Sequence, residues 1–135
     1  GYLFAGPSAA GKSTVAALSP GATVLSDDLV IVRPVRGRYR VYGTPFHGST
    51  STAARCAGSA VLAGIFFLVQ APTHALVPLE GPAALAQLAA TTPFVTTLPA
   101  GAALTLGVCA RLLSQVAPQA LHFRPDAGFW EVIYA

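Results

Sequence analysis

Short apolar runs alternate with segments of helical spacing along this chain, and glycine and proline separate them. Apolar runs typical of buried strands cover residues 2–5, 22–25, 62–69, 75–78 and 120–124. Apolar positions at helical spacing, with proline near the ends, predict helices over residues 12–18, 82–90 and 102–116. Strands and helices mixed in this way predict an α/β domain.

Other segments predict local pairing and a loop. Residues 29–33 and 39–42 flank Arg36-Gly37-Arg38, which is typical of a turn, so they predict a β-hairpin with an arginine-lined face. Strand 75–78 is the expected hairpin partner of strand 62–69. Residues 43–59, rich in Gly, Ser and Thr, predict a long loop, which in compact domains is usually functional or disordered. Residues 129–134 predict a short terminal element of either type.

The composition narrows the class of protein. The 135 residues suit one domain, and 53% hydrophobic against 10% charged residues argue against disorder. The net charge of +3 reflects few acids rather than many bases, so nucleic-acid binding is not expected. The most apolar stretch, residues 60–69, is about half the length of a membrane-spanning helix, so no membrane association is expected. Scarce surface charge favours self-association into a homo-oligomer.

Neither the start of the chain nor its cysteines suggest export. Residues 1–6 lack the basic and long apolar regions of a signal peptide. Cys56 and Cys109 have neither metal-ligand spacing nor the number needed for a disulfide framework, so a cytoplasmic location is expected. The chain begins in a strand without an initiator Met, which predicts a fragment of a longer protein.

The most specific motif lies between the first strand and the first helix. Residues 6–13 match G-x-x-x-x-G-K-[ST], the phosphate-binding loop of P-loop proteins, and Thr14 follows. Its glycines let successive amides close on phosphate oxygens. Lys12, the only lysine in the sequence, adds a positive charge, and the Ser13 hydroxyl is a ligand for Mg²⁺. The predicted phosphate-binding residues are Gly6, Pro7, Ser8, Ala9, Ala10, Gly11, Lys12, Ser13 and Thr14.

A pair of carboxylates, Asp27-Asp28, follows the predicted strand 22–25. Because α/β sheets bind ligands at the carboxyl ends of their strands, this pair and the phosphate loop are expected at one sheet edge. Phosphoryl transfer uses one carboxylate near Mg²⁺ and benefits from another that accepts the acceptor's proton. Adjacent side chains on extended backbone point to opposite sides and can divide these tasks. A solvated turn that closes the strand is the alternative.

These residues together resemble a known family. GPSAAGKST at residues 6–14, LSDD at 25–28 and YGTPFHG at 42–48 resemble the HPr serine kinase-related proteins of the phosphoenolpyruvate-carboxykinase-like P-loop superfamily. LAGIFFLVQ, HALVPL and FRPDAGFWEV resemble the HPr-kinase-like branch, which includes kinases of peptide-modification gene clusters. The resemblance covers nearly the whole chain and implies a mixed β-sheet flanked by helices. It also implies ATP- and Mg²⁺-dependent phosphorylation of a serine hydroxyl on a small protein or peptide.

The resemblance assigns roles by position. Asp27 is expected to be the base, Asp28 and Ser13 the Mg²⁺ ligands, and Lys12 the cation at the transferring phosphoryl group. Ala9 stands where the family often has glycine, which a negative φ would allow. The family has an N-terminal portion with a histidine upstream of the phosphate loop, and the present chain does not include it. The family's long C-terminal helix region is not matched either, so the reverse phosphorylase activity is not expected.

Other charged and aromatic residues are weaker candidates. His47 in GTPFHG is expected to contact the γ-phosphate or acceptor, to lie next to the metal as in the carboxykinases, or to bond the backbone of its own loop. Arg55 and Arg124 are candidates to stabilise the transferring phosphoryl group. Four arginines could grip an acidic partner or simply form a solvated face: Arg33, Arg36, Arg38 and Arg40. His74, His122 and Trp130 are expected to pack.

Two other functions remain open. One is a P-loop kinase for a small molecule, although such kinases usually carry an arginine-rich lid that is not evident after Arg111. The other is a non-catalytic domain whose bound nucleotide regulates a partner. Signatures of ABC-type ATPases (LSGGQ) and GTPases (NKxD) do not occur in the sequence.

Overall fold

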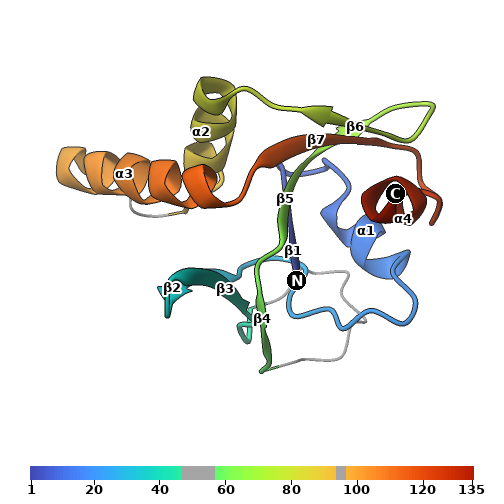
Figure 1. The fold of residues 1–135 in the computed structure, drawn as a ribbon, viewed down its shortest axis with the longest axis horizontal. Helices are drawn as coiled ribbons and strands as arrows, with labels where there is room; N and C mark the ends of the chain where they lie inside the picture. Colours follow the sequence, from blue (N-terminus) through green and yellow to red (C-terminus); the bar gives the residue numbers. More distant parts are fainter. Residues whose placement is uncertain (47–56, 94–96) are drawn as a thin grey trace.

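The structure is a computed structural model, and it describes residues 1–46, 57–93 and 97–135. Within these residues, strands and helices combine into an α/β protein (Figure 1). The strands are β1 (Tyr2–Ala5), β2 (Ile31–Val35), β3 (Arg38–Tyr42), β4 (Ser59–Val61), β5 (Gly64–Gln70), β6 (Ala75–Pro78) and β7 (Pro118–Phe123). The helices are α1 (Lys12–Ala17), α2 (Gly81–Ala90), α3 (Pro99–Gln115) and α4 (Phe129–Tyr134).

The larger sheet has the order β1-β5-β7-β6. Strands β1, β5 and β7 are parallel, so their carboxyl ends lie at one edge, whereas β6 runs antiparallel to β7. Helices cover both faces of this sheet. Side chains alternate along the buried strand β5, so successive residues pack against opposite helix layers. Phe66 and Leu68 belong to the cluster that includes α1 and α4, and Ile65 and Phe67 to the cluster that includes α2 and α3. The expected mixed β-sheet flanked by helices is confirmed.

The smaller sheet is antiparallel, with the order β2-β3-β4. The predicted hairpin is confirmed, and its two-residue turn is Arg36-Gly37, with φ of 51° and 79°. Paired positive φ values are typical of hairpin turns that match the twist of their strands. Arg38, which was expected in the turn, is instead the first residue of β3.

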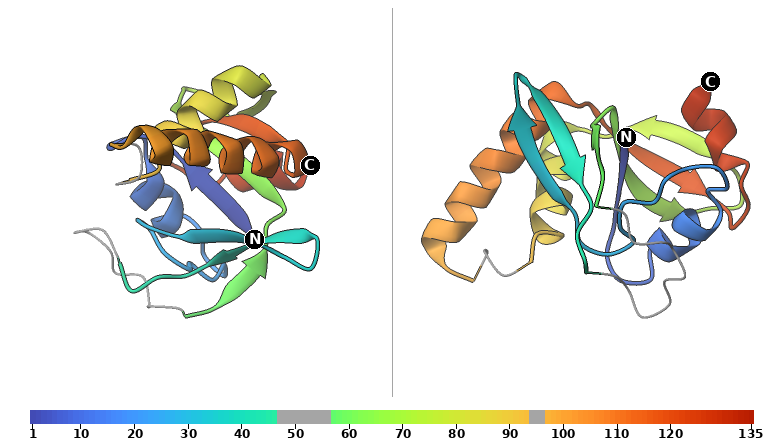
Figure 2. Two further views of the ribbon diagram at one scale, coloured as in Figure 1. Left: turned by 90° about the vertical axis from the view of Figure 1, so that its left-hand side faces the viewer. Right: turned by 90° about the horizontal axis from the view of Figure 1, so that it is seen from below.

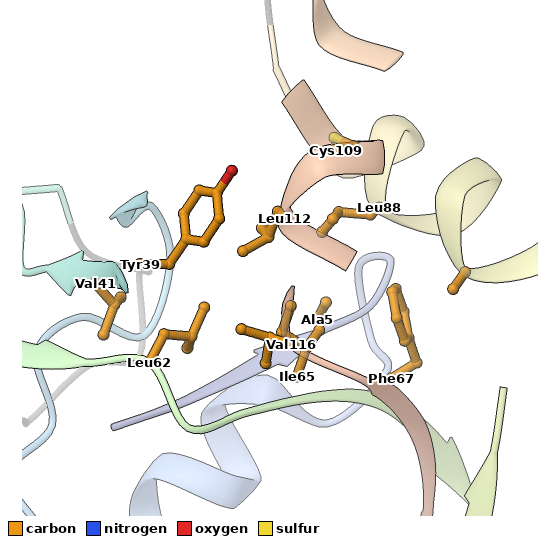
Figure 3. Packing of buried hydrophobic residues seen from close by; sticks show 11 residues of the cluster. Ala5, Tyr39, Val41, Leu62, Ile65, Phe67, Leu88, Cys109, Leu112 and Val116 are labelled. Atoms are coloured by element: carbon orange, nitrogen blue, oxygen red, sulfur yellow. The ribbon is translucent and has the colours of Figure 1, made fainter. Parts of the chain in front are cut away.

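The two sheets share one hydrophobic core. Tyr39 and Val41 of the small sheet belong to the same buried cluster as Ile65 and Leu112 (Figure 3). The chain passes from β4 to β5 through Leu62, which is 5% exposed and also joins this cluster. Figure 2 shows β4 and β5 following one another from the small sheet into the large one. The predicted strand 62–69 is therefore the observed β5, reached through a bend after β4.

Two strand predictions are wrong. Residues 22–25 form no strand, because a turn with Gly21 at φ 80° precedes them and no strand pairs with them. Residues 75–78 form β6 as predicted, but β6 pairs with β7 rather than with β5. Strand β7 lies between them, and this central position buries its side chains Leu121 and Phe123, which are 0% and 2% exposed. β6, with Val77 43% exposed, suits the sheet edge.

The helix predictions are confirmed with shifted ends. Helix α3 begins three residues earlier than predicted, with Pro99 in its first turn, where a missing amide costs nothing. Pro118, expected to end this helix, is the first residue of β7. The terminal element of undecided type is helix α4. Among the described helices, none combines the length and apolar character needed to cross a membrane.

Candidate functional site

The phosphate loop connects β1 to α1 at the edge where the parallel strands end. Lys12, the first residue of α1, folds its side chain back over the loop. Its Nζ donates to the carbonyl oxygens of Gly6 at 2.8 Å and Pro7 at 2.7 Å. The only lysine in the sequence is thereby held at the mouth of the predicted phosphate site. In this arrangement the ammonium can move from two carbonyls to a phosphate oxygen.

The loop also presents backbone donors. Ala10 donates to the Pro7 carbonyl at 3.2 Å, which closes the turn. In the described part of the chain, the amides of Gly11, Lys12 and Ser13 donate to no acceptor. Successive unpaired amides beside an ammonium group are what a phosphate group requires of a protein. The loop residues are thus suited to bind an anion.

Two glycines allow this loop to close tightly. Gly11 has a φ of 108°, and a Cβ built there would lie 2.6 Å from Cζ of Phe123 in β7. A Cβ at Gly6 would lie 2.7 Å from Cβ of Ala10. Both positions therefore exclude any side chain, as the motif requires.

Ala9 corrects one expectation. Alanine at this position, where the family often has glycine, was considered tolerable if its φ is negative, but the observed φ is 65°. A left-handed residue with a Cβ costs about 1–2 kcal/mol relative to glycine. Gln70, at the end of β5, donates its Nε2 to the Ala9 carbonyl at 2.9 Å and so helps to fix this part of the loop. Gln70 was missed by the sequence reasoning, and the only signal for it was its place at the end of a strand beside β1.

Asp27 and Asp28 lie in the loop before β2 rather than at the end of a strand. The rationale that placed them at the sheet edge was therefore wrong, because residues 22–25 form no strand. The amide of Asp28 donates to Oγ of Ser26 at 3.2 Å, and this Oγ donates to the Phe46 carbonyl at 3.0 Å. The Ser26 hydroxyl thus holds the bend at Asp27 and Asp28, which closes no strand, and Asp28 lines the larger hollow together with the phosphate loop.

Two hollows meet at the phosphate loop and this turn. The smaller, of about 480 Å³, is lined by residues of α1, α4 and the loop before β2, including both aspartates. The larger, of about 850 Å³, is lined by the phosphate loop and by mostly apolar residues of α2 and α3. Lys12 and Asp28 line both hollows. The larger hollow thus brings Asp28 together with four of the predicted phosphate-binding residues, and Asp27 lines the smaller hollow: Gly6, Pro7, Ser8 and Lys12.

Of the two predicted Mg²⁺ ligands, Asp28 lines both hollows, whereas Ser13 lines neither. Ser13 and Asp28 are exposed side chains, and Ser13 is in the first turn of α1. Within residues 1–46, 57–93 and 97–135, no three His, Cys, Asp or Glu side chains gather as a metal site. Mg²⁺ is usually bound by one or two protein groups together with substrate phosphates and water. A Mg²⁺ site at Ser13 and Asp28 therefore stays a prediction.

A charged cluster lies at the same sheet edge, beyond β7. Asp126 accepts a hydrogen bond from the Gly128 amide at 2.9 Å, lies 2.7 Å from Nε2 of His74 and pairs with Nε of Arg124. The Gly128 amide, followed by His74 and Arg124, lowers the pKa of Asp126 from 3.8 to about 2. His74, expected to pack, is therefore part of an ionic cluster, and its buried Nδ1 has no partner among the described residues. Arg124, the candidate phosphoryl stabiliser, is held by Asp126.

The remaining candidates divide into packing residues and residues outside the description. Trp130 stacks on Tyr134 with ring centroids 5.3 Å apart, so it packs as expected. Cys109 is a buried free thiol whose pKa is raised by burial. His47, Arg55 and Cys56 lie outside the described residues, as does most of the predicted loop 43–59.

Comparison with known proteins identifies no family for this chain. No protein-family model, curated protein or solved structure matches the chain.

Proposed function

We propose that this protein is an ATP- and Mg²⁺-dependent kinase that phosphorylates a serine hydroxyl of a small protein or peptide, as its resemblance to HPr kinase-like proteins implies. The observation that carries the proposal is the position of Lys12. Its ammonium lies over a loop whose amides at Gly11, Lys12 and Ser13 have no acceptor among the described residues, and it lines both hollows together with Asp28. Phosphoryl transfer requires the triphosphate and the acceptor hydroxyl to meet beside the same charged groups.

Each residue has a distinct part in this proposal. The amides of Gly11, Lys12 and Ser13 bind phosphate oxygens, and Lys12 neutralises charge on the γ-phosphoryl group. Ser13 and Asp28 would hold Mg²⁺, which would neutralise charge that develops on the phosphate oxygens. The serine oxygen forms a bond to the γ-phosphorus while the bond from this phosphorus to the leaving ADP oxygen breaks. Asp27 accepts the proton of the serine hydroxyl.

The two hollows suit two substrates. In this proposal one hollow holds the nucleoside and the other receives the acceptor serine. Lys12 and Asp28, which line both hollows, would then lie between the two substrates. The mostly apolar lining of the larger hollow, with Leu88, Val108 and Leu112, suits an apolar group next to the reacting centre. His47 remains a proposed catalytic residue outside the described part of the chain.

Single-turnover transfer from γ-labelled ATP tests the proposal. Label in a protein or peptide serine supports it, label in a metabolite supports a small-molecule kinase, and nucleotide binding without transfer supports a regulatory domain. Asp27→Asn is expected to keep ATP binding and to lower the transfer rate by about 100-fold or more, because general base catalysis contributes about that much. Full transfer by Asp27→Asn would remove Asp27 from the role of base.

Glu131→Gln is the matched control for this substitution. Glu131 is an exposed carboxylate on α4, and it lines neither hollow. Its replacement removes the same charge from the protein and is expected to leave transfer unchanged. An equal loss in both variants would indicate a general charge effect instead of a base at Asp27.

A further inference from the structure

The outward face of the β2–β3 hairpin is crowded with arginines. Strand alternation places Val32, Tyr39 and Val41 on the core side of the small sheet, with Tyr39 and Val41 buried. The opposite side carries cross-strand neighbours Arg33 and Arg40, with Arg38 opposite Val35. We call this side, together with Arg36 in the turn, the arginine face. In Figure 1 the hairpin lies on the side of the molecule away from α1 and α4.

The positive charges of this face are not neutralised by the chain itself. The sequence has five acidic residues, all within the described part, and none of them makes an ion pair with the four arginines. Arg33 lies over the Tyr42 ring at 5.9 Å, and Arg40 donates to Oγ of Ser59 at 2.9 Å. Like charges directly opposite one another on neighbouring strands are destabilising. An anionic partner would remove this repulsion.

The arginine face also has an apolar centre. Ile31 is 55% exposed and Val61 is 37% exposed, and both lie on this side of the sheet beside Tyr42 and Arg40. Arginine and tyrosine around exposed apolar side chains are the composition typical of protein interfaces. Pro34 removes one amide from the edge strand β2, so side-chain recognition is favoured over the addition of a strand.

We propose that the arginine face docks an acidic segment of the acceptor protein or peptide, away from the site of phosphoryl transfer. The identity of the partner as the acceptor rests on the proposed kinase function. Carboxylates of the segment would pair with the arginine guanidinium groups, and its apolar side chains would cover Ile31 and Val61. The apolar centre favours a peptide over a nucleic acid, whose charged backbone would bring nothing to cover these two side chains.

Peptide binding tests the proposal without ATP. The probe is a fluorescein-labelled peptide of about 15 residues with alternating Glu and Leu around one Ser, and the control peptide has Gln in place of Glu. The wild-type protein is expected to bind the acidic probe with an affinity that falls as salt rises. The double variant Arg33→Gln/Arg38→Gln is expected to bind it about tenfold more weakly.

Two controls make the result specific. Arg111→Gln removes an exposed arginine from α3 and is expected to bind the acidic probe as the wild type does. The charge-reversed variant Arg33→Glu/Arg38→Glu is expected to prefer a matching peptide with Lys in place of Glu. Circular dichroism verifies that each variant is folded.

Three results would overturn the proposal. The first is equal affinity for the acidic and Gln peptides, and the second is an unchanged affinity of the double variant. The third is tighter binding of single-stranded DNA or of anionic phosphatidylserine vesicles than of the acidic probe. Lys12→Ala should still bind the probe, so failure of the kinase function and failure of this docking surface are separate outcomes.

Discussion

At the scale of single residues, the phosphate loop is shaped by contacts that leave no room for a side chain at two positions. Gly11 combines a φ of 108° with a close approach to the Phe123 ring, and Gly6 lies against Ala10. Ala9 tolerates a positive φ with a Cβ, because its side chain is exposed. The loop therefore depends on glycine where the backbone meets another residue, and less where it faces solvent.

Gly11→Ala tests this dependence. The new Cβ would be strained by the positive φ and would also collide with Phe123, so the free energy of unfolding should fall by about 2–4 kcal/mol. Gly21→Ala is the matched control, because Gly21 has a φ of 80° but no atom within 4 Å of the position that a Cβ would take. It should lose only about 1–2 kcal/mol. Urea denaturation measures both, and equal losses would contradict a tight contact between Gly11 and β7.

How well the sequence predicts the site depends on how far apart in the chain the interacting residues lie. The loop motif and Asp27-Asp28 are local patterns, so the sequence alone indicated them, and the structure places Lys12 and Asp28 along the same hollows. Phe123 and Gln70 contact the loop from strands that are distant in the sequence. No local pattern predicts such contacts, because they arise only when β5 and β7 pair.

At the scale of elements, the turn from β7 to α4 is stabilised by one carboxylate. Asp126 binds the Gly128 amide at the start of α4, His74 before β6 and Arg124 after β7. A single side chain thus connects three segments at the sheet edge.

The pH dependence of stability follows from this carboxylate. The Gly128 amide, His74 and Arg124 lower the pKa of Asp126 in the folded protein from 3.8 to about 2. Its contribution to stability is therefore present above about pH 4 and is lost as the pH falls from about 4 to about 2. Asp126→Asn should be less stable than the wild type at pH 7, and the difference should shrink over that acid range. Thermal denaturation across this range measures the effect.

Glu131→Gln is the control for the acid range. Glu131 forms no ion pair within the described residues, so its replacement should leave the pH dependence of the wild type in place. A difference between Asp126→Asn and the wild type that stays constant from pH 4 to pH 2 would contradict the role given to Asp126.

Sequence patterns predicted most elements but not all of their partners. Alternation and turn residues were sufficient for the hairpin, since both depend on neighbours in the chain. Residues 22–25 are as apolar as a strand but pack as a loop, with Leu25 against the core cluster. β6 was assigned to β5 because hairpins usually join neighbours, whereas the more apolar β7 took the place between them.

At the scale of the whole molecule, the small sheet extends the core of the large one and leaves its charged side outward. Tyr39 and Val41 contribute to the same cluster as Leu112 and Ile65, while Arg33 and Arg38 are exposed. The two hollows open beside this joint core and meet at Lys12. One surface for docking and one point for phosphoryl transfer would make the chain suitable for a macromolecular acceptor, in keeping with the proposed function.

The most direct test of the central claim is calorimetric titration of the folded protein with ATP in the presence of Mg²⁺. The wild type is expected to bind one ATP with a dissociation constant between about 1 μM and about 1 mM, as nucleotide substrates commonly do. Lys12→Ala should bind at least about tenfold more weakly, because a charged hydrogen bond to phosphate is lost. Absence of binding by the folded wild type to both ATP and GTP, or equal affinity in Lys12→Ala, would contradict the account.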